Sequence, residues 1–283
     1  MHPALIALII TLGALLLLFI AFLILRAWAL RPGHRNAEMQ KYITGVKYAH
    51  RGLHDSVRAE NSLSAFAAAK AAGYGIELDV RLSADGELVV FHDSTLDRVC
   101  GVSGKVSEIP TAELKKVSLS GTGEGIPTFR EVLELIDGAI PMLIEIKQDP
   151  SEGAVAERLV TELEGYRGDY IVESFNPKAL KDFKAHRPDV LIGILSTDYS
   201  RSEKTRGKPL YWLLTRLYLN FFMRPDFIAY EKCGATIPTL REIRRKFNTP
   251  LIAWTVKSEE EELRALGDGF DTVIFEDYLA SKN

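Results

Sequence analysis

Eight short apolar runs, most of them separated by a helix-like segment, constrain the fold of this chain more than any other feature. The runs span residues 46–50, 75–80, 141–147, 169–175, 189–195, 226–231, 251–256 and 271–276. Segments such as 61–73, 128–138 and 177–188 lie between them and resemble amphipathic helices. Eight parallel strands that alternate with helices can close into a barrel. The sequence therefore predicts an α/β fold, the TIM (β/α)8 barrel.

Two segments are too long and too irregular to be simple crossover helices. Residues 81–128, after the second predicted strand, are rich in Gly, Ser and Thr, and they predict a hairpin arm followed by a small inserted subdomain. Residues 196–225 follow the fifth predicted strand. Within them, the aromatic and leucine side chains of residues 207–223 interleave with Arg and Lys, which suits a helix lying on a membrane surface.

The N-terminus carries an uncharged apolar run from Ala4 to Leu25, long enough to cross a hydrocarbon core of about 30 Å as a helix. A cleaved signal peptide is the alternative, with a small-residue motif at 27–29. The apolar run exceeds the usual hydrophobic region of such peptides, however, and no Lys or Arg precedes it. We therefore expect one uncleaved transmembrane helix with its juxtamembrane linker over residues 1–42, followed by the barrel domain over residues 43–283.

Charged residues after the apolar run predict the side of the membrane on which the barrel lies. The basic residues are Arg26, Arg31, Arg35, Lys41 and Lys47. Because such basic flanks tend to remain in the cytoplasm, we expect a single-pass protein of the cell membrane with a cytoplasmic catalytic domain.

Overall charge and cysteine content exclude some classes of protein. The net charge of -3 over 283 residues is too balanced for a polyanion-binding protein, so nucleic acid is not an expected partner. Cys100 and Cys233 lie far apart and match no metal-binding or disulfide spacing. We expect both to be free thiols.

Acidic side chains stand at the ends of the second and third predicted strands. Glu77 and Asp79 are two residues apart and therefore point to the same face, toward the barrel interior if their apolar neighbours face the helices. Glu145 and Lys147 repeat this arrangement. Buried carboxylates repel one another unless a cation lies between them, and carboxylate oxygens are ligands of Mg²⁺ and Ca²⁺. The sequence predicts one divalent cation here; a salt bridge to Lys147 or Arg51 is the alternative for each acid alone.

Two histidines and an arginine lie at the ends of other predicted strands. His50 and Arg51 follow the first strand, and His92 ends the hairpin arm. A lone histidine is more often structural than catalytic. Two groups that titrate near neutrality beside a cation can, however, move protons on and off phosphoester oxygens. Arg51 can bind a phosphate through two hydrogen bonds and Lys147 can add a point charge, so the sequence predicts phosphate-ester chemistry.

Seven short motifs resemble, in order and spacing, those of the glycerophosphodiester phosphodiesterase family. They are HRG at 50–52, EN at 60–61, ELDV at 77–80, HD at 92–93, EIK at 145–147, SFN at 174–176 and AWTV at 253–256. The resemblance covers nearly all of the chain after the apolar run. It implies a metal-dependent hydrolase that converts glycerophosphodiesters to sn-glycerol 3-phosphate and an alcohol, in phospholipid and glycerol metabolism.

The same resemblance implies a role for each candidate residue. Glu77, Asp79 and Glu145 would bind the cation, Mg²⁺ or Ca²⁺. His50 would act as the general base and His92 as the general acid. Arg51 and Lys147 would bind the phosphate. Glu60, Asn61 and Trp254 are expected supporting residues. Glu60 would hydrogen-bond His50 or the water shell of the cation, and Trp254 would wall the glycerol, with a cap and a packing residue as the alternatives. The nucleophile, water or the substrate's own hydroxyl, stays open.

The sequence is also compatible with two other functions. A lysophospholipase D would apply the same chemistry to membrane lysophospholipids, with the acyl chain guided by the aromatic residues of 207–223. A catalytically inert, membrane-tethered binding protein is the non-enzymatic alternative, although every implied ligand and histidine is present. The expected partners are therefore a small glycerophosphodiester or lysolipid substrate and a membrane.

Overall fold

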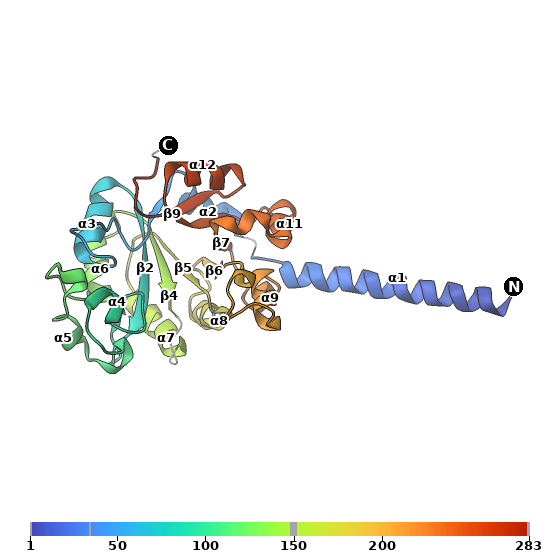
Figure 1. Cartoon of the computed structure of the whole chain (residues 1–283), viewed down its shortest axis with the longest axis horizontal. Helices are drawn as coiled ribbons and strands as arrows, with labels where there is room; N and C mark the ends of the chain where they lie inside the picture. Colours follow the sequence, from blue (N-terminus) through green and yellow to red (C-terminus); the bar gives the residue numbers. More distant parts are fainter. Residues whose placement is uncertain (1, 34, 148–151, 282–283) are drawn as a thin grey trace.

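A computed structural model describes residues 2–33, 35–147 and 152–281 and shows a closed barrel from which one long helix projects (Figure 1). Parallel strands pair in the order β1, β2, β4, β5, β6, β7, β8 and β9, and β9 pairs with β1 to close the barrel. They are β1 (Tyr48–Ala49), β2 (Gly75–Leu82), β4 (Met142–Ile146), β5 (Tyr170–Ser174), β6 (Ile192–Ser196), β7 (Phe227–Glu231), β8 (Leu251–Val256) and β9 (Thr272–Phe275). Each overlaps one of the eight predicted runs, so the predicted TIM barrel is confirmed.

Helices cover the outside of the barrel. They are α3 (Leu63–Ala72), α6 (Phe129–Ile136), α7 (Glu152–Glu162), α8 (Pro177–His186), α11 (Pro238–Phe247), which follows the 3-10 helix η4 (Lys232–Thr236), and α12 (Glu259–Gly267). Polar side chains begin several of them: Ser62 caps α3, and Thr128 and Glu131 form a reciprocal capping box on α6. The apolar helix faces pack on outward-facing strand residues such as Ile76 and Leu78, which are fully buried.

The N-terminal end of the barrel is closed by an apolar plug. The helix α2 (Asn36–Ile43) buries Met39 and Tyr42 there, together with Tyr48 and Phe227 from the strands. The Tyr48 hydroxyl donates a hydrogen bond to the Tyr42 carbonyl oxygen at 2.8 Å. Apolar packing at this end leaves the opposite, C-terminal mouth to carry polar residues.

Residues between β2 and α6 form an inserted subdomain. The strand β3 (Leu88–Val90) pairs antiparallel with β2. Short helical turns follow it, namely α4 (Asp97–Cys100), η1 (Val106–Glu108), α5 (Thr111–Leu114) and η2 (Leu119–Gly121). An apolar cluster of its own, which includes Phe91, Leu96 and Ile126, holds the subdomain together. The predicted hairpin arm and small subdomain are therefore confirmed.

The connection from β6 to β7 departs from expectation, because residues 207–223, called here the aromatic segment, do not form one helix. The connection contains η3 (Tyr199–Arg201), α9 (Pro209–Thr215) and α10 (Asn220–Met223). The Ser196 hydroxyl donates to the Leu214 carbonyl and the Tyr230 hydroxyl to the Thr215 carbonyl, each at 3.0 Å. These barrel side chains hold the last turn of α9, and a turn at Leu217, with φ of +59°, follows and buries the Leu217 side chain in the core.

The helix α1 (Pro3–Leu30) carries the predicted membrane span. A window of 18 residues within it has a mean hydropathy of 3.1, and none of that window is buried against the rest of the protein. The helix is therefore long and apolar enough to cross a membrane. It leaves the barrel beside α9 and α11, on the side away from the inserted subdomain (Figure 1).

Candidate active site

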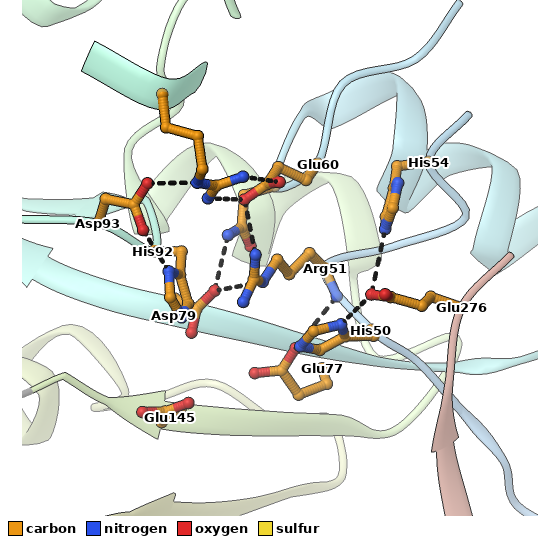
Figure 2. A network of polar contacts seen from close by, with 12 residues as sticks. His50, Arg51, His54, Glu60, Glu77, Asp79, His92, Asp93, Glu145 and Glu276 are labelled. Carbon is orange, nitrogen blue, oxygen red and sulfur yellow. Dashed lines mark hydrogen bonds and ion pairs between the residues drawn. The ribbon is translucent and has the colours of Figure 1, made fainter. Parts of the chain in front are cut away.

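Three buried carboxylates meet at the C-terminal mouth of the barrel (Figure 2). Glu77 and Asp79 lie on β2 and Glu145 on β4, where Asp79 and Glu145 are paired in register. Strand alternation turns these acids inward because Ile76 and Leu78 face the helices. One oxygen from each carboxylate lies within 4.8 Å of the other two. The structure thus brings together the three residues for which the sequence predicts cation binding.

Burial and mutual repulsion shift the pKa values of these acids. Burial and the neighbouring carboxylates raise the pKa of Glu77 well above its usual range, and burial raises the pKa of Glu145 to about 7. Burial alone would also raise the pKa of Asp79, but Lys147 and Arg51 hold it below its ordinary value. Lys147 Nζ lies 2.8 Å from Glu145 Oε1 and 3.3 Å from Asp79 Oδ1. Salt bridges therefore coexist with the carboxylate cluster.

The chemistry of this cluster fits a divalent cation. All its donor atoms are carboxylate oxygens, which Mg²⁺ and Ca²⁺ prefer. Among the described residues Asp79 Oδ1 is buried and accepts no hydrogen bond, although Lys147 Nζ lies 3.3 Å from it. Glu173 on β5 adds a further buried carboxyl group, whose pKa burial raises well above its usual range. Burial and mutual repulsion raise the pKa values of Glu77, Glu145 and Glu173, and a bound divalent cation would offset that repulsion and favour their ionised form.

Each predicted catalytic histidine is held through one ring nitrogen by a carboxylate. His50 Nδ1 hydrogen-bonds the Glu276 carboxylate, and His50 Nε2 lies 3.9 Å from Glu77 Oε2. His92 Nδ1 lies 2.6 Å from Asp93 Oδ1. Burial lowers the pKa of both histidines, while the hydrogen bond to Glu276 partly opposes this shift in His50 and the charge of Asp79 partly opposes it in His92. In His50 the hydrogen bond to Glu276 leaves Nε2 as the nitrogen that can accept a proton on the side of the acidic cluster.

Arg51 is positioned beside the carboxylates by a network of its own. Its Nη1 donates to Glu60 Oε1 at 2.8 Å, and its Nε lies 3.3 Å from Asp79 Oδ2. Arg98 of the inserted subdomain donates to both oxygens of Glu60 at 2.7 Å. Asn61 Nδ2 donates to Asp79 Oδ2 at 2.8 Å. The guanidinium is therefore held at the rim of the acidic cluster, where it can contact an anionic substrate.

Of the expected supporting residues, Trp254 lines a cavity at the site, whereas Glu60 holds Arg51 rather than His50. No hydrogen bond joins Glu60 to His50 in the described part of the chain, where Glu60 instead holds Arg51. A contact of Glu60 with the water shell of the cation stays a prediction. Trp254 on β8 packs edge-on against Phe175, with ring centroids 5.4 Å apart. It also lines a cavity of about 110 Å³ whose walls include His50 and Glu77.

Two acids of the site, Glu276 and Glu173, are not predicted from the sequence. Each stands at the carboxyl end of a predicted strand, Glu276 directly after β9 and Glu173 within β5. Position alone could have indicated them, because the C-terminal strand ends of a barrel all face one mouth. Their partners could not be read from sequence, since these depend on the register of neighbouring strands.

The fold and the site together define a class of protein. A TIM barrel with acid–base groups and cationic side chains gathered at its C-terminal mouth is a barrel hydrolase suited to anionic esters. Residues 50–279 match the model of the Glycerophosphoryl diester phosphodiesterase family, so the chain belongs to that family. It is accordingly an enzyme, a phosphoric diester hydrolase.

Relatives in sequence and structure agree with this assignment. A glycerophosphodiester phosphodiesterase from Caldanaerobacter subterraneus subsp. tengcongensis is 33% identical over 240 residues, which cover 81% of this chain and 93% of the relative. A solved glycerophosphodiester phosphodiesterase from Thermotoga maritima is 27% identical, with a TM-score of 0.64 over 81% of this chain and 94% of that one. An Oleispira antarctica phosphodiesterase, solved with its product sn-glycerol-3-phosphate, shares the fold with a TM-score of 0.71 at 24% identity, over 84% of this chain and 94% of that one.

Proposed function

We propose that this protein hydrolyses glycerophosphodiesters to sn-glycerol 3-phosphate and an alcohol in a reaction that depends on a divalent cation. The observation that carries the proposal is the convergence of Glu77, Asp79 and Glu145 within 4.8 Å, beside two cationic side chains. A phosphodiester is an anion, and its transition state places further charge on the phosphoryl oxygens. The family membership and the relatives' activity support the same substrate class.

The proposed cation ligands are Glu77, Asp79 and Glu145, and the proposed ion is Mg²⁺ or Ca²⁺. A bound divalent cation would supply Lewis-acid stabilisation of the charge on the phosphoryl oxygens. Arg51 and Lys147 would bind the same phosphate, Arg51 through two hydrogen bonds and Lys147 as a point charge. Asn61 supports this arrangement because it holds Asp79 by a hydrogen bond.

Proton transfer is assigned to the two histidines. His50 is the proposed general base, because Glu276 holds its Nδ1 and leaves Nε2 able to accept a proton from the nucleophile. His92 is the proposed general acid, which returns a proton to the leaving alcohol oxygen. Glu60 and Arg98 act through Arg51 as positioning residues. Trp254 would form a wall of the glycerol site.

The location of the enzyme is also a proposal. Residues 1–42 would supply a single-pass anchor in the cell membrane with its linker, and residues 43–283 a cytoplasmic catalytic domain. Support comes from the apolar length of α1 and from the basic residues that follow it. A second candidate function, lysophospholipase D activity on membrane lysophospholipids, is favoured by an apolar groove that leads from the site toward α1.

Phosphorus NMR of the full-length protein in detergent tests the proposed reaction. The purified enzyme is incubated with glycerophosphocholine and other soluble diesters, with chelator, with Mg²⁺ or with Ca²⁺. We expect glycerol 3-phosphate to appear only with a divalent cation. The absence of turnover with every cation, by a protein that still melts cooperatively, would overturn the proposal. Equal turnover in chelator would overturn the role of the cation alone.

A further inference from the structure

A large groove extends from the acidic cluster across the C-terminal face of the barrel, over the segments that follow β5 and β6. Its volume is about 1080 Å³, and it begins at Glu145 and Lys147. Beyond them it runs between the start of α8 and the aromatic segment. Its apolar lining there includes Phe175, Leu210, Leu214, Leu219, Phe221 and Phe222. A small soluble diester has no chemical group that needs such a surface, whereas a hydrocarbon chain does.

The far end of this groove meets the end of the predicted membrane span. Phe221 lines the groove and also stacks on Trp28 of α1, with ring centroids 4.7 Å apart. The uncharged run ends at Leu25, so Trp28 lies about one helical turn beyond it, at the level where aromatic side chains favour the membrane interface. The groove therefore opens where α1 would enter the bilayer.

Polar contacts fix α1 in this position against the barrel. Arg26 forms an ion pair with Glu242 of α11, and its Nε donates to the Tyr218 hydroxyl at 3.1 Å. Arg224 Nη1 donates to the carbonyl oxygens of Trp28 and Arg31, each at 2.7 Å. A helix held by contacts to α11 and to the aromatic segment is not a loose tether. The contacts determine which side of the barrel faces the membrane.

The surface around the groove opening has the composition of a membrane interface. Leu210 is 54% exposed, Trp212 50% and Phe222 41%. Basic groups lie directly over two of these rings: Lys181 Nζ is 4.3 Å from the Phe222 centroid, and the Arg216 guanidinium is 4.8 Å from that of Trp212. Aromatic rings with basic side chains suit the boundary between acyl chains and anionic head groups.

We propose that the groove binds the acyl chain of a lysophospholipid, which enters sideways from the bilayer beside Trp28 and Phe221 while the docked helix α1 keeps the opening at the membrane surface. This inference rests on the proposed phosphodiesterase function and specifies its substrate. In the reaction, the oxygen of water bonds to phosphorus and the bond from phosphorus to the head-group oxygen breaks. The leaving alcohol takes up a proton, and the acylated glycerol phosphate remains.

A paired-substrate assay on the full-length protein in phosphatidylcholine vesicles tests the inference. Lysophosphatidylcholine in the vesicles and glycerophosphocholine in solution contain the same scissile bond and both release choline. Phe222→Asp places a charge at the groove opening, and Trp28→Ala removes the aromatic stack. Each should lower the ratio of lysolipid to soluble turnover by about tenfold or more, because an apolar contact with the chain is lost. Leu263→Asp on α12, where Leu263 is 65% exposed and outside the groove, is the matched control and should leave the ratio unchanged.

The outcomes separate this inference from the proposed function. If the wild-type protein hydrolyses neither substrate with any divalent cation, the proposed function fails. If it hydrolyses glycerophosphocholine and leaves the lysolipid intact, or if both groove variants keep the wild-type ratio, the groove inference fails while the proposed function stands. Soluble turnover by each variant reports that its barrel is folded.

Discussion

His50 and Glu276 form a hydrogen-bonded pair across the seam where the first and last strands close the barrel. His50 follows β1 and Glu276 follows β9, and the His50 N–H donates to the Phe275 carbonyl at 2.8 Å. Burial would raise the pKa of Glu276, but hydrogen bonds from His50 and His54 hold it well below its usual range. Glu276 therefore stays ionised and holds the Nδ1 proton of His50, so closure of the barrel also orients the proposed general base.

Replacement of Glu276 by Gln keeps a hydrogen-bond acceptor for His50 and removes the charge. We expect kcat to fall by about tenfold to hundredfold, because the ring is less firmly oriented and less basic. Burial lowers the pKa of His50 and Glu276 raises it, so the variant should have a still lower His50 pKa. The acidic limb of the pH profile of kcat/KM should move to lower pH. Steady-state kinetics with glycerophosphocholine measure both effects.

The matched control for this variant is Asp277→Asn, at the neighbouring exposed position that pairs only with Lys257 among the contacts described. It should leave kcat and the pH profile unchanged. A Glu276→Gln enzyme with a wild-type acidic limb would show that Glu276 does not act through His50.

The raised pKa of Glu145 determines how the stability of the cation-free protein should depend on pH. Burial raises its pKa from 4.5 to about 7, so the folded protein holds this proton more tightly than the unfolded chain. In chelator, Glu145 should make its full contribution to the free energy of unfolding at pH values below 4.5. The contribution should be lost as pH rises from 4.5 to about 7. Glu145→Gln should flatten this dependence in thermal melts and lower turnover by about a hundredfold.

A cation should reverse the destabilisation in the wild-type protein. Mg²⁺ or Ca²⁺ should raise its melting temperature above the same pH window, and Glu145→Gln should lose most of that rise. Glu134→Gln, at an exposed position of α6, is the control and should keep it. An identical cation response in Glu145→Gln and wild type would exclude Glu145 as a ligand.

The barrel and part of its site could be predicted because they depend on local patterns. Apolar runs mark the strands, and strand alternation places Glu77 and Asp79 on one face. The general arrangement of a barrel then brings Glu145 to the same mouth. The pairing of His50 with Glu276 lies beyond such reasoning, since it joins residues 226 positions apart through the register of β1 on β9.

The aromatic segment shows a second limit of local patterns. Its composition fits one surface helix, but α9 ends at Thr215, where Ser196 and Tyr230 hydrogen-bond its last turn to the barrel. Glu60 is a similar case, because its partner Arg98 comes from the inserted subdomain, whose packing on the barrel no local pattern specifies. In both cases a tertiary contact decides between conformations or partners that the local sequence allows equally.

Arg51 should not be replaceable by Lys. Its Nη1 holds Glu60 while its Nε lies beside Asp79, and a lysine ammonium group cannot make both contacts and still offer two donors to a phosphate. Arg51→Lys should lower kcat/KM for glycerophosphocholine by about tenfold to hundredfold. Arg58→Lys, in an exposed pair with Asp55, is the control and should have wild-type kinetics. Equal kinetics for both variants would remove Arg51 from phosphate binding.

Topology can be tested by cysteine labelling in intact cells. The native thiols Cys100 and Cys233 are free, as expected, and burial raises the pKa of each to about 11, so both should react slowly with maleimide. Cysteine is introduced by His2→Cys before α1 or by Glu260→Cys on the exposed surface of α12. A membrane-impermeant maleimide should label the first variant in intact cells and the second only after permeabilisation, because the basic residues after α1 favour a cytoplasmic barrel. Labelling of the Glu260→Cys protein in intact cells would place the barrel outside. The substrate would then have to come from the outer face of the membrane.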